Sequence, residues 1–330
     1  MRRFRKILLW LIATVLLLLL IGGVAGVLVL RSGWFQEKVR ARILEELTHA
    51  TGGQVELGRF DFDWQGMVAK VGPLVIHGKE SATEPPFLRV AAVSLGLKVI
   101  SALERNVDLA SLNIDHPEVH VVVYADGSTN LPSPGGATSS GGNWAEQLVN
   151  AHIRRYEITS GIFELDQRRI PLNLAGEDLH VILNYRAANP AYEGELTSRR
   201  FRISRVSKSP IEVGIASNFV LDKDGFRIPK LDVTTAESVA HLRGTLADVR
   251  TPHGEFAVDA EVAIKEVVRA FPLPIGPRGK ARFEGKMQID FGTPFGFGMQ
   301  GHAVAQGVSY ARDRLRIENG AVAALSAAAP

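Results

Sequence analysis

The 330-residue sequence contains no cysteine. Disulfide bonds, thiol catalysis, iron–sulfur clusters and thiolate zinc sites are therefore excluded. Hydrophobic residues make up 46% of the chain and charged residues 22%. This composition is typical of a folded protein and excludes disorder along the whole length.

The chain also lacks the excess of positive charge that nucleic-acid-binding proteins carry. Its net charge is +3, but four of its 38 Lys and Arg residues lie within the first six positions, at Arg2, Arg3, Arg5 and Lys6. Residues 1–30 contain no acid, so the rest of the chain holds 34 cations against all 35 acids. A nearly neutral body does not attract phosphate backbones, and we expect no nucleic-acid partner.

Charge is absent from residues 7–30, a run of 24 positions. At ~1.5 Å per residue a helix of this length reaches ~36 Å, enough to cross a ~30 Å hydrocarbon core. A cleaved signal peptide is the alternative, although its apolar region usually covers only ~7–15 residues. We predict a single-pass transmembrane anchor, with residues 1–6 as a cytoplasmic stub according to the positive-inside rule.

A short amphipathic helix is predicted after the anchor. Phe35, Val39, Ile43 and Leu47 recur at steps of four, charged residues fill the other side, and Gly52 follows as a stop signal. Such a helix could cover one end of a β-structure or lie on the membrane surface. Its mixed charge favours the first role.

From Gln54 onward the apolar period changes from four to two, which predicts β-strands. A β-bulge is expected at Gly58, because Phe60 and Phe62 lie out of step with Val55 and Leu57. Strands that are apolar on one side and charged on the other predict an antiparallel sheet that must cover its apolar face. The clearest alternations are Val93 to Val99, Val119 to Val123, Phe256 to Ile264 and Ala281 to Phe291.

The chain is expected to divide at a segment rich in Gly, Ser and Pro. Residues 31–131 form a first β region with its end helix, and residues 132–143 a flexible linker. Residues 144–320 continue the β region after a short helix near its start. The alanine-rich residues 321–330 are expected to be disordered, or to mark a truncated chain.

No catalytic or metal motif persists once its structural context is considered. Residues 296–301 (GFGMQG) match a dinucleotide-binding string, but the alternation of Phe297 and Met299 with glycine indicates a strand. His116 and His120 also lie in a strand, where positions four apart are ~13 Å from each other. Asp61 and Asp63 share a face at ~7 Å, near the spacing of glycosidase carboxylates, but a solvated face explains them better. We predict no catalytic residue, metal or cofactor, and keep an envelope hydrolase that uses these two aspartates as an alternative.

Several short motifs resemble, in their order along the chain, the AsmA-like superfamily, which includes the TamB translocation and assembly proteins. They are residues 51–58 (TGGQVELG), 60–64 (FDFDW), 76–78 (IHG), 107–109 (VDL), 114–119 (IDHPEV), 126–132 (DGSTNLP) and 160–166 (SGIFELD).

The resemblance implies an inner-membrane protein of a diderm bacterium, with its N-terminus in the cytoplasm and most of the chain in the periplasm. It also implies that the elongated sheet curls into an open groove lined by apolar side chains. Relatives are implicated in phospholipid transport and outer-membrane biogenesis, and we expect that function here. The alternative is a scaffold for outer-membrane protein translocation and assembly. Its partner would be an outer-membrane barrel protein or further groove modules at the C-terminal edge.

In such a groove, phospholipid acyl chains would contact the inward side chains of the alternating strands. A closed β-sandwich would bury the same side chains as ordinary core, and the alternation alone does not separate the two folds. The predicted lipid-lining residues are Leu95, Leu97, Val121, Val258, Val262, Phe283, Met287, Ile289 and Phe297.

Overall fold

The structure is a computed structural model that describes residues 33–63, 65–97, 109–132, 144–168, 172–205, 210–249, 251–270, 278–290, 296–312 and 315–329. The predicted anchor, residues 7–30, lies outside these residues. Within the described ranges, no helix combines the length and the apolar character needed to cross a bilayer.

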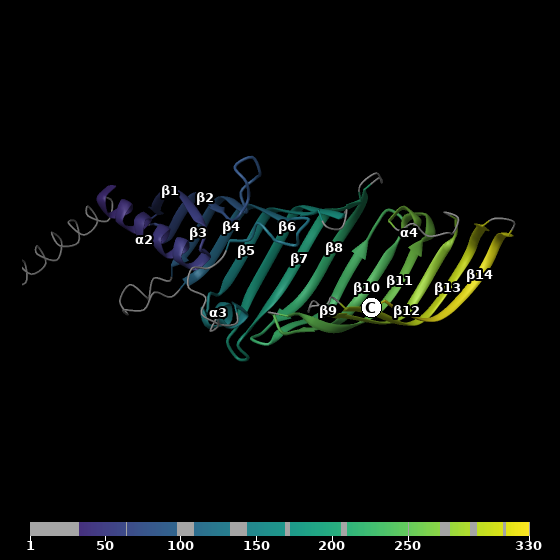
Figure 1. Cartoon of the computed structure of the whole chain (residues 1–330). Coiled ribbons are helices and arrows are strands. Elements are labelled where there is room, and N and C mark those ends of the chain that lie inside the picture. The colour runs from purple at the N-terminus through teal and green to yellow at the C-terminus, as the bar shows by residue number, and fades with distance from the viewer. Residues whose placement is uncertain are drawn as a thin grey trace, which may run out of the picture.

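In the part of the chain that the structure describes, fourteen strands form one sheet in which every strand lies beside its neighbours in the sequence. The sheet is curved and open, with β1 and β14 at its two edges (Figure 1). The prediction of a mostly β, open sheet is confirmed, and the described residues form one sheet rather than two packed sheets. The strands are β1 Gln54–Asp63, β2 Val68–His77, β3 Leu88–Leu97, β4 Leu109–Val123, β5 Arg155–Gln167, β6 Leu172–Arg186, β7 Ala191–Arg205, β8 Ile211–Leu221, β9 Gly225–Thr234, β10 Val239–Ala247, β11 His253–Ala263, β12 Lys280–Asp290, β13 Gly296–Arg312 and β14 Leu315–Ala329.

Within the described residues, three helices accompany the sheet. α2 (Gly33–Thr51) precedes β1, α3 (Trp144–Asn150) precedes β5, and α4 (Ile264–Ala270) follows β11. Figure 1 shows α3 and α4 at opposite margins of the curved sheet. The predicted helices after the anchor and at the start of the second β region are confirmed.

The sheet departs from the predicted antiparallel arrangement at one pair of strands. β4 and β5 run parallel, with Leu112 beside Tyr156 and Val121 beside Leu165. Parallel neighbours need a long crossover, and residues 124–154 provide it and carry α3. The alternating pattern within each strand is the same in both arrangements, so it could not reveal this pair.

Two further predictions are wrong. Ile264 does not end a strand but begins α4, and β11 ends at Ala263. The alanine-rich residues 321–329 are not disordered, because they belong to β14 and pair with β13. Alanine has low β propensity, but the ladder uses backbone groups that every residue except proline provides in full.

We call the apolar side of the sheet, which faces α2, the inward side. At one level of the first strands, the residues that face inward switch between odd and even sequence positions. In β1 the inward side chains of Leu57 and Phe60 are separated by two residues instead of one, and in β2 the same holds for Leu74 and Val71. Because both strands carry the extra residue, their register continues unchanged. The apolar side therefore changes at Gly58 as predicted, but not through a bulge confined to β1, because β2 changes at the same level and the register between the two strands shows no shift. In β4, β5 and β6 the backbone has positive φ at His116, Ser160 and Asp178.

Aromatic rings cover several glycines on neighbouring strands of the sheet. A Cβ added to Gly194 would lie 2.3 Å from the ring of Phe219, and one added to Gly285 would lie 2.8 Å from Cζ of Phe283. Gly285 is paired with Gly301 on β13. Rings of this kind restore packing where a glycine leaves a strand bare.

The outer side of the sheet carries charged side chains in diagonal pairs. Lys286 Nζ lies 2.6 Å from Glu255 Oε1, and Lys280 Nζ lies 2.6 Å from Glu261 Oε1. The hydrogen bond from Lys286 lowers the pKa of Glu255, and the one from Lys280 lowers the pKa of Glu261. This side is therefore suited to water, whereas the inward side is apolar.

Candidate functional site

An apolar cavity of about 640 Å³ lies between α2 and the inward side of the first four strands. Every side chain that lines it is apolar. The lining residues are Phe35, Val39, Ile43, Leu47, Leu57, Phe60, Phe62, Met67, Ala69, Val71, Leu74, Val93, Leu95, Leu97 and Leu112.

The predicted apolar side of α2 therefore faces the sheet. Phe35, Val39, Ile43 and Leu47, the residues that recur at steps of four, all line the cavity. This placement agrees with a helix that covers one end of a β-structure. The sequence had predicted the helix and its apolar side, but it did not reveal that a hollow remains beneath it.

Arg40 attaches α2 to the sheet at the extra residue of β1. Its Nε donates hydrogen bonds to the carbonyl oxygens of Leu57 at 3.0 Å and Gly58 at 2.9 Å, and its Nη1 donates to Glu37 Oε1 at 2.7 Å. Gly58 is required here, because an added Cβ would lie 2.2 Å from the carbonyl oxygen of Gly72. The irregularity in β1 thus provides both the shape of the cavity and the acceptors that hold its cover.

The strand registers place all nine predicted lining residues on the inward side of the sheet. Leu95 and Leu97 line the cavity itself. Val121 lies on the same side in β4, beside Leu165 of β5. The other six lie in β11, β12 and β13, in which the residue pairs include Val258 with Gly285, Val262 with Ala281, Phe283 with Ala260, Met287 with Phe256, and Ile289 with Phe297.

The inward side of β9 to β12 forms a second apolar region. Phe256, Val258 and Ala260 are buried there, and Met287 and Ile289 pack against them. Phe297 of β13 is 37% exposed. Residues on the inward side thus form apolar surface both near β1 and far along the sheet.

Between these two regions, α3 packs against the inward side of the sheet. Ala145 and Val149 are fully buried against Tyr192 and Leu221. The hydroxyl of Tyr192 donates hydrogen bonds to the carbonyl oxygens of Ile153 at 2.9 Å and Leu148 at 3.3 Å. Burial raises the pKa of Tyr192, so the hydroxyl keeps its proton and remains a donor.

Replacing Tyr192 with phenylalanine is expected to weaken the attachment of α3 by about 1–3 kcal/mol, because buried carbonyls lose their donor. Amide hydrogen exchange in residues 145–150 should then become faster. Tyr185→Phe is the matched control, since it removes a different hydroxyl and keeps the aromatic ring that packs against Tyr192 at 5.3 Å. Equal exchange in both variants would contradict the assigned role of the Tyr192 hydroxyl.

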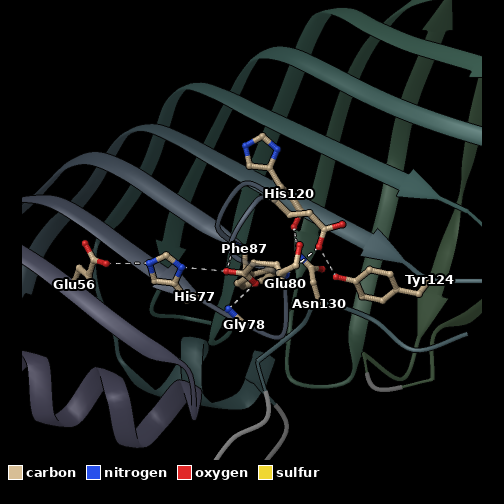
Figure 2. A network of polar contacts seen from close by, with 10 residues as sticks. Glu56, His77, Gly78, Glu80, Phe87, His120, Tyr124 and Asn130 are labelled. Atoms are coloured by element: carbon tan, nitrogen blue, oxygen red, sulfur yellow. Dashed lines mark hydrogen bonds and ion pairs between the residues drawn. The ribbon is translucent and has the colours of Figure 1, made fainter.

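A polar network joins the loop after β2 to the end of β4 (Figure 2). The Glu80 side chain, only 4% exposed, accepts hydrogen bonds from the backbone N–H groups of Gly78 at 2.8 Å and Phe87 at 3.3 Å, and contacts His77 Nδ1 at 3.2 Å. A Cβ added to Gly78 would lie 1.8 Å from the carbonyl oxygen of Asn130. The motifs at residues 76–78 and 126–132 therefore meet in space and fix the loops at one margin of the sheet.

Glu84 holds the loop after β2 to residues that follow the C-terminal ends of β4 and β5. Its Oε2 accepts hydrogen bonds from the Ser81 N–H at 3.0 Å and the Tyr124 hydroxyl at 2.8 Å, and its Oε1 accepts from Arg168 Nη2 at 2.6 Å. These bonds, the one from Ser81 first, lower the pKa of Glu84 from its ordinary 4.5 to about 2.

The loop is therefore expected to loosen in acid. A carboxyl whose folded pKa is lowered contributes stability above its unfolded value near 4.5, and this contribution disappears as the pH falls toward about 2. Hydrogen exchange of residues 79–87, measured across this range, should show the change. Glu84→Gln should remove the pH dependence, and an identical acid transition in this variant would contradict the assignment.

The alternative catalytic candidates do not converge on a site. Asp61 and Asp63 are exposed on the outer side of β1. His116 lies near Glu118, at 3.6 Å, whereas His120 contacts Glu164 at 3.0 Å. Among the residues that the structure describes, no cluster of three His, Asp or Glu side chains could hold a metal ion.

Comparison with known proteins adds no family assignment. Neither a scan of protein-family models nor a search of curated proteins finds a match for this chain. The resemblance to AsmA-like proteins stays a prediction from the motifs.

Proposed function

We propose that the chain binds phospholipid acyl chains on the inward side of its sheet and carries lipid along it as part of outer-membrane biogenesis. The observation that supports this most directly is the cavity beneath α2, in which every lining side chain is apolar. A hydrocarbon tail gains about 0.8 kcal/mol for each CH₂ group removed from water. A volume of about 640 Å³ also lies within the range of small-molecule pockets.

The position of α2 in the sequence fits uptake from a membrane. The uncharged run ends at residue 30, and α2 begins at Gly33. If residues 7–30 anchor the chain in the inner membrane, the cavity lies beside the bilayer and the later strands extend into the periplasm. The charged outer side of the sheet suits that aqueous compartment. This function requires no catalytic residue, metal or cofactor.

Site-specific photo-cross-linking tests the proposal. A photoreactive residue at position 95, on the inward side, should form adducts with phospholipid when the full chain is extracted from membranes. The same residue at position 94 is the control, because Ser94 pairs with Lys70 and points to the other side of the sheet. Equal yields of lipid adduct at the two positions, or none at position 95, would contradict lipid binding in the cavity.

A scaffold for outer-membrane protein assembly is the second candidate. The observation that favours it is that β14 is an edge strand of the sheet that the described residues form, and an edge strand could pair with a strand of a client protein. Cross-linkers along β14 should then capture a barrel protein. Recovery of lipid at position 95 without any barrel protein at β14 would favour transport over this role.

A further inference from the structure

The size of the cavity beneath α2 limits how much of a lipid it can hold. Its volume is about 640 Å³, and every side chain that lines it is apolar. A methylene group fills about as much space as a water molecule in the liquid, ~30 Å³, so one acyl tail of ~16 carbons needs ~480 Å³ and two such tails need ~960 Å³. The cavity therefore has room for one tail of a phospholipid and is too small for both.

A row of apolar side chains leads out of the cavity across the next four strands. Residues that pair in neighbouring strands carry their side chains on the same side of a sheet, and Val93 lines the cavity. We give the name apolar row to the residues that continue from Val93: Ile114 pairs with Val93, Ile158 with Ile114, Val181 with Ile158, and Leu196 with Val181. Because neighbouring strands lie ~4.8 Å apart, the row extends ~19 Å from Val93.

The helix α3 packs beside the apolar row rather than on it. The half-buried residues packed with α3 include Tyr156 and Leu183, which pair with each other at the next inward position toward the start of β5. In the described part of the chain, no residue of the apolar row belongs to the cluster that packs with α3, and each of its side chains is half-buried. One tail spans half of the ~30 Å hydrocarbon core of a bilayer, ~15 Å, so the row is long enough to hold a tail.

Building on the proposed function, we infer that the cavity takes one acyl tail of a diacyl phospholipid and that the second tail lies outside it, along the apolar row. The two tails of a lipid are joined at the glycerol, so the second tail has to begin close to the cavity. The apolar row begins at the cavity wall and removes this tail from water. A lipid with a single tail fits into the cavity entirely.

The test compares phosphatidylglycerol that carries a diazirine at the end of one palmitoyl tail with lysophosphatidylglycerol whose only tail is the same labelled palmitoyl chain. Each lipid is cross-linked to the full chain in a non-ionic detergent, at no more than one lipid per chain, and the adducts are mapped by mass spectrometry of peptides. The lysolipid should label mainly α2 and β1 to β4. The diacyl lipid should divide its adducts between these elements and β5 to β7, within about twofold of equal shares, because its two tails have nearly equal affinity for the cavity.

A variant that fills the cavity provides a second measurement. Ala69 has the smallest side chain of the cavity lining. Ala69→Phe should lower the share of lysolipid adducts in α2 and β1 to β4 at least about twofold, because the added ring takes up space that the tail needs. Ala69→Leu should shift the adducts in the same direction by less. Lys70→Phe is the matched control and should leave the adducts unchanged, since Lys70 is exposed on the outer side of β2.

The outcomes separate the inference from the function on which it rests. If neither lipid labels α2 and β1 to β4 in the wild-type protein, the proposed function fails. If the diacyl lipid labels these elements alone, the cavity holds both tails, and the inference is overturned while lipid binding stands. Lysolipid adducts that divide between the cavity and β5 to β7 as the diacyl adducts do, or adducts unchanged by Ala69→Phe, would also overturn it.

Discussion

Replacing Met287 with glutamate is expected to reduce lipid transfer to acceptor vesicles at least about tenfold, while the cavity beneath α2 still takes up lipid. Met287 lies in the middle of β12 on the inward side, between Phe256 of β11 and Met299 of β13. A tail that passes this point would desolvate an ionised carboxylate, which costs several kcal/mol, and about 1.4 kcal/mol already changes a rate or affinity tenfold. Transfer of a fluorescent phospholipid between vesicles measures the first effect, and cross-linking at position 95 measures the second.

Two control variants distinguish a block of lipid transfer from damage to the fold. Met287→Leu keeps an apolar side chain of similar volume and should transfer lipid at nearly the wild-type rate. Gln300→Glu introduces the same charge on the outer side of β13, opposite Lys286, and should also have little effect. Undiminished transfer by the Met287→Glu protein would show that lipid does not pass along β12. The chain would then be a lipid-binding protein whose site ends near β4.

The inward residues of the later strands could be predicted because their alternation is uninterrupted. In β12 the exposed and half-buried positions alternate from Lys280 to Asp290 without exception, as the sequence pattern predicts. The placement of Met287 and Ile289 on one side follows from the strand period alone. No partner strand has to be known for that step.

The cavity could not be predicted in the same way, because it depends on contacts between distant segments. Phe60 and Val71 face it only because an extra residue shifts both β1 and β2, and the sequence marks only the shift in β1, at Gly58. The role of Arg40 depends on backbone carbonyls 17 and 18 residues away. A helical pattern shows which side of α2 is apolar, but the volume left beneath it depends on how far the sheet curves.

The role of Asn130 illustrates a second limit of the sequence. The motif at residues 126–132 begins with the turn residues Asp126 and Gly127, and this local pattern does not show what Asn130 contacts. In the structure Asn130 is fully buried, its Oδ1 accepts a hydrogen bond from the Val122 N–H at 2.8 Å, and its Nδ2 donates to the carbonyl oxygen of His120 at 2.8 Å. Its own carbonyl oxygen accepts from the N–H of Lys79, also at 2.8 Å. The Asn130 side chain therefore pairs with backbone groups at the C-terminal end of β4, and the Asn130 backbone connects this end to the loop after β2.

Replacing Asn130 with alanine is expected to cost about 2–4 kcal/mol in the stability of this region, because a buried N–H and a buried carbonyl each lose their partner. In an elongated sheet each strand contacts mainly its neighbours, so the loss should appear as local opening rather than as unfolding of the whole chain. Amide hydrogen exchange should accelerate at Val122 and Lys79 and remain unchanged in β12.

Two matched variants make this prediction specific to the Asn130 side chain. Leu131→Ala changes the next residue, which is 42% exposed, and should leave the exchange of Val122 almost unaltered. Asn130→Asp keeps an acceptor for the Val122 N–H but loses the donor to His120, so the amide of Val122 should stay protected. If Asn130→Ala left Val122 protected as well, its hydrogen bond would not limit local opening, and the margin of the sheet would have to be held mainly by Glu80 and Glu84.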